Sequence, residues 1–198
     1  MPSRAGRVRF RRHSDPSPYV LALYPFYSRF SRFLGRDGAD AAAHRRGVAE
    51  NHAVNAGAPR LYSPLFRRAE RPRESALARR YVHEKLPGYL RPQALRRLRW
   101  HQQQGHITAL VSNSPENYLL QWGRSLNIDI ICGTRLGSDG QTLSGEVDGE
   151  DCVGSEKVRR LREKMTDLDN YQIYAYGDSS GDAELLAIAD APFYRNWY

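Results

Sequence analysis

The chain has 198 residues and a formal net charge of +8, a length that suits one domain with room for a small insertion. Its two cysteines, Cys132 and Cys152, argue against a disulfide framework and are expected to be free thiols. Because no signal peptide is recognisable, this cysteine usage predicts a cytoplasmic protein.

The positive charge is confined to the N-terminal part of the chain. Residues 1–80 contain 17 arginines, no lysine and 6 acidic residues, whereas residues 81–198 contain 13 basic and 16 acidic residues. A basic segment interleaved with aromatic residues is one pattern of RNA or single-stranded DNA binders, and nucleic-acid binding is kept as a minor alternative. Residues 19–34 are rich in apolar and aromatic side chains, but a proline and two arginines within them argue against a membrane span.

From residue 86 onward, the apolar pattern alternates between helices and strands. A helix is expected at 92–104, with Gly105 as its stop. The other expected elements are a strand at 107–111, a helix at 115–126, a strand at 128–132, a hairpin of strands at 134–136 and 142–147, a helix at 155–165, a strand at 171–176 and a helix at 182–188. This alternation predicts an α/β fold with a parallel, doubly wound sheet. His83, His101 and His106, near helix ends, are expected to be surface or capping residues.

The strand expected at 107–111 leads into Ser112 and Asn113, and Ser114-Pro115 then predicts a helix start. A hydroxyl at a strand end, beside the unpaired N–H groups of a helix start, is suited to a phosphate oxygen. The open alternative is that the two serines only cap the helix.

Lys157 lies in the first turn of the helix expected at 155–165, just after Gly154-Ser155. The helix dipole favours cations at the opposite end, so this position needs another reason, and a phosphate group would supply one. The chain has only three lysines, which adds weight to the placement, although a solvated surface lysine stays the open alternative.

Two aspartates follow the last predicted strand. Asp178 comes directly after Gly177, and Asp182 lies one helical turn further on. Both carboxylates can reach one hard, oxygen-ligated cation such as Mg²⁺, and ligand sites in open α/β sheets lie at such strand ends. The sequence therefore predicts Asp178 and Asp182 as metal ligands, with helix capping by Asp178 as the alternative.

These three motifs, in the order strand-Ser, helix-opening Lys and strand-Gly-Asp-x-x-x-Asp, resemble those of the haloacid dehalogenase (HAD) superfamily of phosphohydrolases. The likeness is greatest to its phosphoserine-phosphatase-like branch, subfamily IB. It covers about residues 78–198 and includes the flanking segments 86–92, 100–106 and 192–195. The resemblance implies a HAD-like, Rossmann-like doubly wound sheet with a helical cap region.

The resemblance also implies a Mg²⁺-dependent phosphatase that forms a phosphoaspartate. In this family an aspartate at the end of the first strand attacks a phosphomonoester, and a second aspartate two residues on protonates the leaving group. Here Ser112 and Asn113 would bind the transferring phosphoryl group, and Lys157 would offset its charge. Asp178 would hold Mg²⁺, with Asp182 as a further ligand or a support. The substrate would be a small phosphorylated metabolite, phosphoserine among them, or a lipid head-group phosphate.

The first motif of the family, Asp-x-Asp-Gly-Thr after a buried strand, is absent from this chain. Codons for residues 8–17, when read one base later, can encode Phe-Asp-Phe-Asp-Gly-Thr-Leu-Thr-Arg, which contains the complete motif. The first and third bases of each shifted codon are dictated by the protein sequence, and all of them fit. We hypothesise that residues from about 8 to between 70 and 80 are an out-of-frame translation, which the nucleotide sequence would test.

The sequence thus divides into an arginine-rich segment at 1–77, in place of the first core strand and the cap, and a hydrolase core at 78–198. We expect residues 1–17 to be a poor buried strand, so that the sheet lacks its middle strand and the chain is unstable and inactive. Two alternatives stay open: a HAD-like protein that binds phosphate or Mg²⁺ without hydrolysis, and a basic nucleic-acid-binding arm fused to a HAD remnant.

Overall fold

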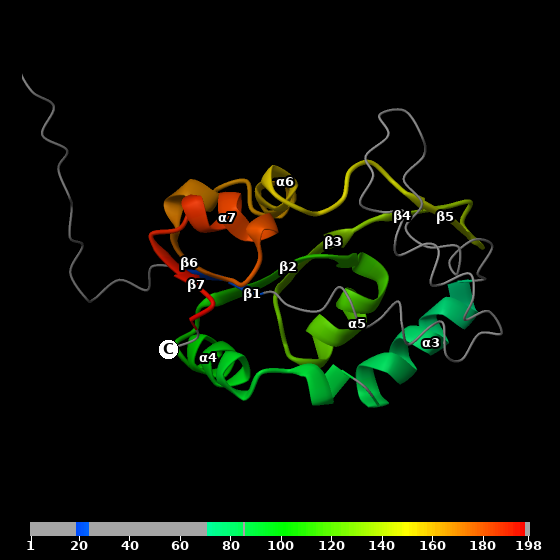
Figure 1. Cartoon of the computed structure of the whole chain (residues 1–198), viewed down its shortest axis with the longest axis horizontal. Helices are drawn as coiled ribbons and strands as arrows, with labels where there is room; N and C mark the ends of the chain where they lie inside the picture. Colours follow the sequence, from blue (N-terminus) through cyan, green and yellow to red (C-terminus); the bar gives the residue numbers. More distant parts are fainter. Residues whose placement is uncertain (1–18, 24–70, 85, 197–198) are drawn as a thin grey trace, which may run out of the picture.

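The computed structural model describes residues 19–23, 71–84 and 86–196. In this part of the chain, a parallel sheet in the order β3-β2-β1-β6-β7 forms the centre of the fold (Figure 1). Its strands are β1 (Tyr19–Leu23), β2 (Ile107–Pro115), β3 (Ile130–Thr134), β6 (Gln172–Gly177) and β7 (Ala191–Tyr194). The chain builds the sheet outward from β1 in one direction and then in the other, which is a doubly wound order, so the predicted fold class is confirmed.

The middle strand of the sheet is present, and the prediction that it is missing is wrong. β1 pairs with β2 on one side and with β6 on the other, and Ala22 is in register with both Ala109 and Ala175. The strand consists of Tyr-Val-Leu-Ala-Leu, which carries no charge and is rich in residues that suit a sheet interior. The charged residues 8–17, considered for this place from the sequence, lie outside the described residues.

Helices cover both faces of the sheet. One face carries α3 (Arg71–Glu84), α4 (Pro92–Gln103) and α5 (Glu116–Ser125), and the other carries α6 (Ser155–Lys164) and α7 (Ala183–Ala187) (Figure 1). Short 3-10 helices are η2 (Leu86–Tyr89), η3 (Leu168–Asn170) and η4 (Ser180–Asp182). The predicted helices are confirmed within a few residues at their ends. Gly105 follows α4 with φ +74°, a left-handed conformation that commonly ends helices and that glycine adopts most easily.

Some elements begin or end at other residues than the sequence predicted, and one strand was not predicted. β2 runs past residue 111 to Pro115, which pairs with Thr134 beyond an irregularity in the register, so α5 begins one residue later than expected. β3 begins at residue 130 because the Ile128 backbone N–H still bonds to the Gly123 carbonyl at the end of α5, 2.9 Å away. β7 was not predicted, since Pro192 breaks its pattern, but proline is tolerated in an edge strand.

β4 (Leu136–Ser138) and β5 (Leu143–Val147) form the predicted antiparallel hairpin. β4 begins two residues later than the strand expected at 134–136, because β3 extends to Thr134. Its turn is fixed by Asp139, whose carboxylate accepts hydrogen bonds from Thr142 and Gln141. The division of the chain at residues 77 and 78 stays a prediction; α3 runs across this boundary, and residues 24–70 lie outside the described part.

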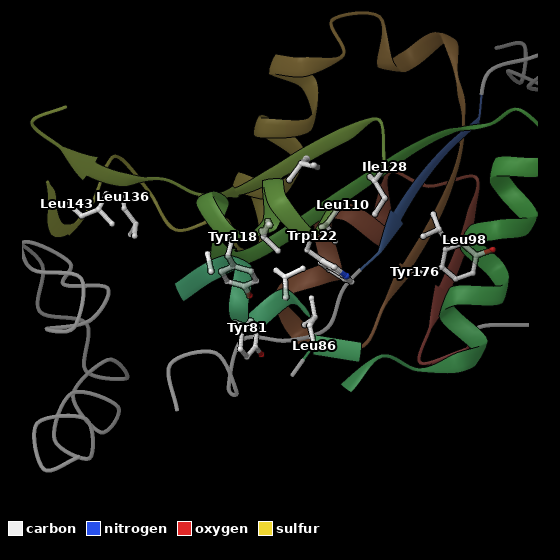
Figure 2. Close-up of a cluster of buried hydrophobic side chains, with 14 residues drawn as sticks. Tyr81, Leu86, Leu98, Leu110, Tyr118, Trp122, Ile128, Leu136, Leu143 and Tyr176 are labelled. Carbon is white, nitrogen blue, oxygen red and sulfur yellow. The ribbon is translucent and has the colours of Figure 1, made fainter. Parts of the chain in front are cut away.

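Two apolar clusters lie on the two sides of the sheet. The cluster under α3, α4 and α5 includes Tyr81 and Tyr118, whose rings meet edge to face with centroids 5.9 Å apart, and Trp122 (Figure 2). The cluster under α6 and α7 contains the two cysteines, which are buried free thiols as predicted. Among the described helices, none is long and apolar enough to cross a bilayer.

His101 is fully buried in the fold, contrary to its predicted surface position. It lies on the inner side of α4, where its Nδ1 is 2.8 Å from Nδ1 of His106 and its Nε2 is 3.2 Å from the Tyr176 hydroxyl. The ring of Tyr174 completes an edge contact with it, 5.3 Å between centroids. The contacts with Tyr174 and Tyr176 come from β6, far along the chain, so the local pattern around α4 could not reveal them.

Gly133 of β3 packs against the start of α5, and this contact gives a test of the packing. A Cβ atom there would lie 2.6 Å from Cα of Glu116 and 2.8 Å from Cδ1 of Leu119. The Glu116 backbone cannot move away alone, because it belongs to a hydrogen-bonded helix. Gly133→Ala is therefore expected to lower the free energy of unfolding by about 1–3 kcal/mol in urea titrations. Gly88→Ala is the control, since nothing lies within 4 Å of its Cβ position. Equal unfolding midpoints for the two variants would contradict this packing.

Candidate active site

The site lies where the strand order reverses. β2 and β6 flank β1 and run parallel to it, so the carboxyl ends of all three meet at one edge of the sheet. Ser112 lies near the end of β2 and Asp178 directly after β6, and two strand spacings separate these strands, about 10 Å. The fold therefore brings the motifs from the two ends of the hydrolase core to the same crevice.

Ser112 and Asn113 are held at this edge by local hydrogen bonds. Ser112 is buried, and its Oγ accepts a hydrogen bond from the Ser114 backbone N–H at 3.2 Å. The Thr134 hydroxyl lies 2.7 Å from the Asn113 carbonyl oxygen and 3.0 Å from its Oδ1, and its one proton serves one of them at a time. The same Thr134 oxygen accepts from the Cys152 N–H at 3.0 Å. Thr134 thus ties the end of β2 to the segment that leads into α6.

Lys157 reaches the edge from the first turn of α6. Its side chain is only 1% exposed, and its ammonium forms an ion pair with Asp182 Oδ1. The Gly154 N–H donates to the Gly181 carbonyl at 3.0 Å, which joins the start of α6 to η4. Gly154 has φ +60°, so the chain turns into α6 through a conformation that favours glycine. The predicted alternative of a solvated surface lysine is wrong for this residue, because Asp182 accompanies it into the interior.

Asp182 uses both carboxylate oxygens within the protein. Oδ1 accepts from Lys157, while Oδ2 accepts from the backbone N–H of Asp178 at 3.1 Å, the N–H of Ser179 at 3.0 Å and the Ser179 hydroxyl at 2.8 Å. Burial acts to raise the pKa of Asp182, but Lys157 and the hydrogen bonds from Ser179 outweigh it and lower the pKa. Asp182 is therefore an ionised group that fixes Lys157 and the loop after β6.

Asp178 has a different environment. Its side chain is 15% exposed, and its Oδ2 lies 3.6 Å from Arg91 Nη2, too far for a hydrogen bond. The pKa of Asp178 is raised by burial and then by the negative charge of Asp182, against the opposing charges of Arg91, Arg195 and Lys157. Burial and the neighbouring Asp182 thus outweigh the three positive charges and disfavour the ionised form of Asp178.

The donor set fits a magnesium ion through Asp178. Among the described residues, no group of three or more His, Cys, Asp or Glu side chains gathers as a metal site, and the oxygens of Asp182 are engaged. Mg²⁺ usually keeps several waters and binds one or two carboxylates together with substrate phosphate oxygens. Burial and the charge of Asp182 raise the pKa of Asp178, and a cation beside Asp178 would favour its ionised form again.

Four residues around this site were given no role from the sequence. Ser179 was readable, because Ser179-x-x-Asp182 has the spacing of a capping box, which the structure contains. Thr134 gave no local signal, since it reaches Asn113 from a different strand. Arg91 and Arg195 lie in the flanking segments 86–92 and 192–195 of the resemblance, but their contacts with Asp178 join residues 87 and 17 positions apart.

Solved structures share this fold. A protein of unknown function from Bordetella pertussis Tohama I matches with a TM-score of 0.70 and 21% identity, over 86% of this chain and 85% of that one. A probable phosphoserine phosphatase from Vibrio cholerae matches with a TM-score of 0.63 and 14% identity, over 88% of this chain and 55% of that one. A substrate-bound phosphoserine phosphatase matches with a TM-score of 0.58 and 16% identity, over 87% and 83%. At these identities the matches show the fold alone.

Sequence comparison adds a curated relative and a family. Protein CicA of Caulobacter vibrioides is 41% identical over 120 residues, which are 60% of this chain and 53% of CicA. The chain therefore spans about half the length of the curated relatives it matches. The family model of haloacid dehalogenase-like hydrolases matches residues 12–187. Since that match includes the three motifs at the carboxyl edge and most of the chain, the protein belongs to the haloacid dehalogenase-like hydrolase family.

Proposed function

We propose that the carboxyl edge of β2, β1 and β6 is a phosphatase-type site that binds the phosphoryl group of a small phosphomonoester. The observation that carries the proposal is the buried Lys157, fixed by Asp182 at the same sheet edge as Ser112. Placing a lysine in the interior is costly, and a structural role alone would be served as well by an apolar pair. A fixed positive charge at a strand-end crevice is what phosphoryl binding requires.

Each residue has a role in binding. The Ser112 hydroxyl would donate to a phosphoryl oxygen while its own oxygen stays oriented by the Ser114 N–H, and Asn113 would lie beside it. Lys157 would offset the phosphoryl charge, and Asp182 would keep the ammonium in place. Asp178 would hold Mg²⁺, which when bound supplies further positive charge to the phosphoryl oxygens. Asp182 then supports the site and is not itself a ligand.

Turnover through a phosphoaspartate requires an attacking carboxylate, and the sequence directly after β1 contains none. The family's attacking carboxylate follows the first strand, whereas here β1 is followed by Tyr24-Pro25-Phe26, and the nearest acidic residues in the sequence are Asp15 and Asp37. Without an attacking carboxylate, a bound phosphomonoester would not be cleaved through a phosphoaspartate. The chain with this sequence is therefore proposed to bind phosphate without hydrolysing it.

The proposal is tested by comparing binding with turnover. Calorimetric titration with inorganic phosphate in the presence of Mg²⁺ is expected to show one site, and p-nitrophenyl phosphate is expected to release no product above background. Ser112→Ala should weaken phosphate binding by about 10-fold or more, since a hydrogen bond to a charged group contributes about 1.5–3 kcal/mol. If inorganic phosphate does not bind to the unmodified chain, the proposed site is refuted. If the unmodified chain hydrolyses p-nitrophenyl phosphate, the proposal that it lacks a nucleophile is refuted.

Ser144→Ala is the matched control for the serine. The Ser144 Oγ accepts from the Glu146 backbone N–H at 3.1 Å, the same local geometry as Ser112, but it lies in the exposed hairpin. Phosphate affinity should be unchanged in this variant. If the gene encodes the Asp-x-Asp motif one base along from codon 8, the frame-restored chain should hydrolyse p-nitrophenyl phosphate. The phosphorylated metabolite or lipid head group it would act on, and its cytoplasmic location, stay predictions.

A further inference from the structure

Two arginines from distant parts of the chain converge on Asp178. Arg91 lies just before α4 and approaches the Asp178 carboxylate, with 3.6 Å between Nη2 and Oδ2. Arg195 follows β7, and its Nε donates to the Asp178 carbonyl oxygen at 3.1 Å. Neither residue belongs to the motifs that bind phosphate in the proposed function. Both arginines are exposed, and Asp178 directly follows β6.

Arg195 is fixed by its backbone as well as its side chain. Its N–H donates to the Gly177 carbonyl at 2.7 Å, and its guanidinium lies over the Tyr194 ring, 5.1 Å from the centroid. Its φ of +52° is in the left-handed region, which is uncommon for a residue with a side chain. The fold therefore maintains a strained backbone that directs a guanidinium to the end of β6.

Arg91 is available to a ligand. Its side chain is 52% exposed, and its ion pair with Asp178 is longer than a hydrogen bond. Ion pairs that are this long and have one exposed partner are weak, so a ligand can replace this contact at little cost. The backbone of Arg91 is held in place because its carbonyl accepts from Leu95 N–H at 3.2 Å, at the start of α4.

Two guanidinium groups approach Asp178 without a hydrogen-bonded ion pair to its carboxylate. Arg195 donates to the Asp178 carbonyl oxygen, and Arg91 Nη2 is 3.6 Å from the carboxylate. A second anionic group on the substrate can therefore bind these guanidinium groups. Guanidinium groups bind carboxylate and phosphate through paired N–H donors.

We propose that Arg91 and Arg195 form a second anion subsite beside the phosphoryl pocket, and that the protein prefers phosphomonoesters which carry a further carboxylate or phosphate group. This inference rests on the proposed function, because it places the first phosphate at Ser112 and Lys157. It narrows the substrate class from any phosphomonoester to those with two anionic groups.

Three small probes separate the contributions of the two anions. Ethyl phosphate carries the phosphate alone, 2-phosphoglycolate adds a carboxylate at the same length, and ethylene glycol bisphosphate adds a second phosphate. At constant ionic strength and with Mg²⁺, the unmodified chain should bind at least one of the two doubly anionic probes about 10-fold or more tightly than ethyl phosphate. The probe with the larger gain identifies the second anion as carboxylate or phosphate.

Arg91→Gln and Arg195→Gln should each reduce that preference, measured against ethyl phosphate on the same variant, to within about 3-fold. Arg99→Gln, an exposed arginine on α4, is the control for net charge and should leave the preference intact. Far-ultraviolet circular dichroism and urea midpoints verify that the variants fold. Loss of the preference in Arg99→Gln as well would indicate general attraction and overturn the subsite.

The two proposals fail in different ways. If ethyl phosphate and inorganic phosphate do not bind at all, the proposed function is refuted. If they bind, but the doubly anionic probes show no preference or keep it in Arg91→Gln and Arg195→Gln, the second anion subsite is refuted while the phosphoryl site stands.

Discussion

Lys157→Met is expected to lower the free energy of unfolding by about 3–5 kcal/mol. The substitution leaves the buried carboxylate of Asp182 without its cation, although its other oxygen keeps the hydrogen bonds from the loop after β6. Because Lys157 helps to lower the pKa of Asp182, its removal should also shift that pKa upward. Urea titrations at pH 7 measure the loss, and a smaller loss at acidic pH would show that Asp182 then becomes neutral by taking up a proton.

The chain contains a matched control for this substitution on the same helix. Lys164 lies at the end of α6, is 36% exposed and pairs with Glu116 at 3.3 Å. Lys164→Met should cost less than about 1 kcal/mol, as exposed ion pairs usually do. If the two lysine variants have equal unfolding midpoints, the buried pair is not what holds α6 to the loop after β6.

Acidification is expected to destabilise the fold through His101. Burial, together with the positive charges that His106 and Arg97 can present, lowers the pKa of His101 from 6.5 to about 3. The unfolded chain takes up a proton on this residue near pH 6.5, and the folded chain does not until about pH 3. The contribution of His101 to stability is therefore complete above pH 6.5 and is lost as the pH falls through that window.

At pH 5 the loss from His101 is about 2 kcal/mol, since each pH unit in the window costs about 1.4 kcal/mol. Urea midpoints at pH 7.5 and pH 5.0 give the slope for the unmodified chain and for His101→Gln, which cannot titrate. The slope should be smaller in His101→Gln, even though the variant loses ring contacts and is less stable at both pH values. Parallel slopes for the two proteins would contradict the role of His101.

The sequence predicted a site at the carboxyl ends of two strands, and there is a physical reason why these ends lie together. Apolar residues that lead into Ser112 or into Gly177-Asp178 are a local pattern, and parallel strands bring their carboxyl ends to one edge. Ser112 itself lies within β2, which continues to Pro115. The order of the strands along the edge follows from the family resemblance. The roles of the individual side chains stay proposals.

The prediction of a missing middle strand shows the limit of local patterns. Residues 19–23 carry no motif, so no local pattern placed them between β2 and β6. Hydrogen bonding to two neighbours selects an uncharged, β-favouring segment, whichever residues follow it. Without β1, the facing edges of β2 and β6 would have unpaired backbone N–H and C=O groups. A strand that lacks the family motif still pairs these groups.

The amino-acid pattern alone determined the alternation of helices and strands, the hairpin, and the location of Lys157 and Asp178 at element ends, because these depend on spacings within a few residues. Only the tertiary structure decided that Lys157 is buried against Asp182, that His101 is enclosed by aromatic rings of β6, and that Arg91 and Arg195 meet at Asp178. Those contacts join residues 17 to 87 positions apart, and their energies depend on burial and on neighbouring charges, which exist only once the sheet has assembled.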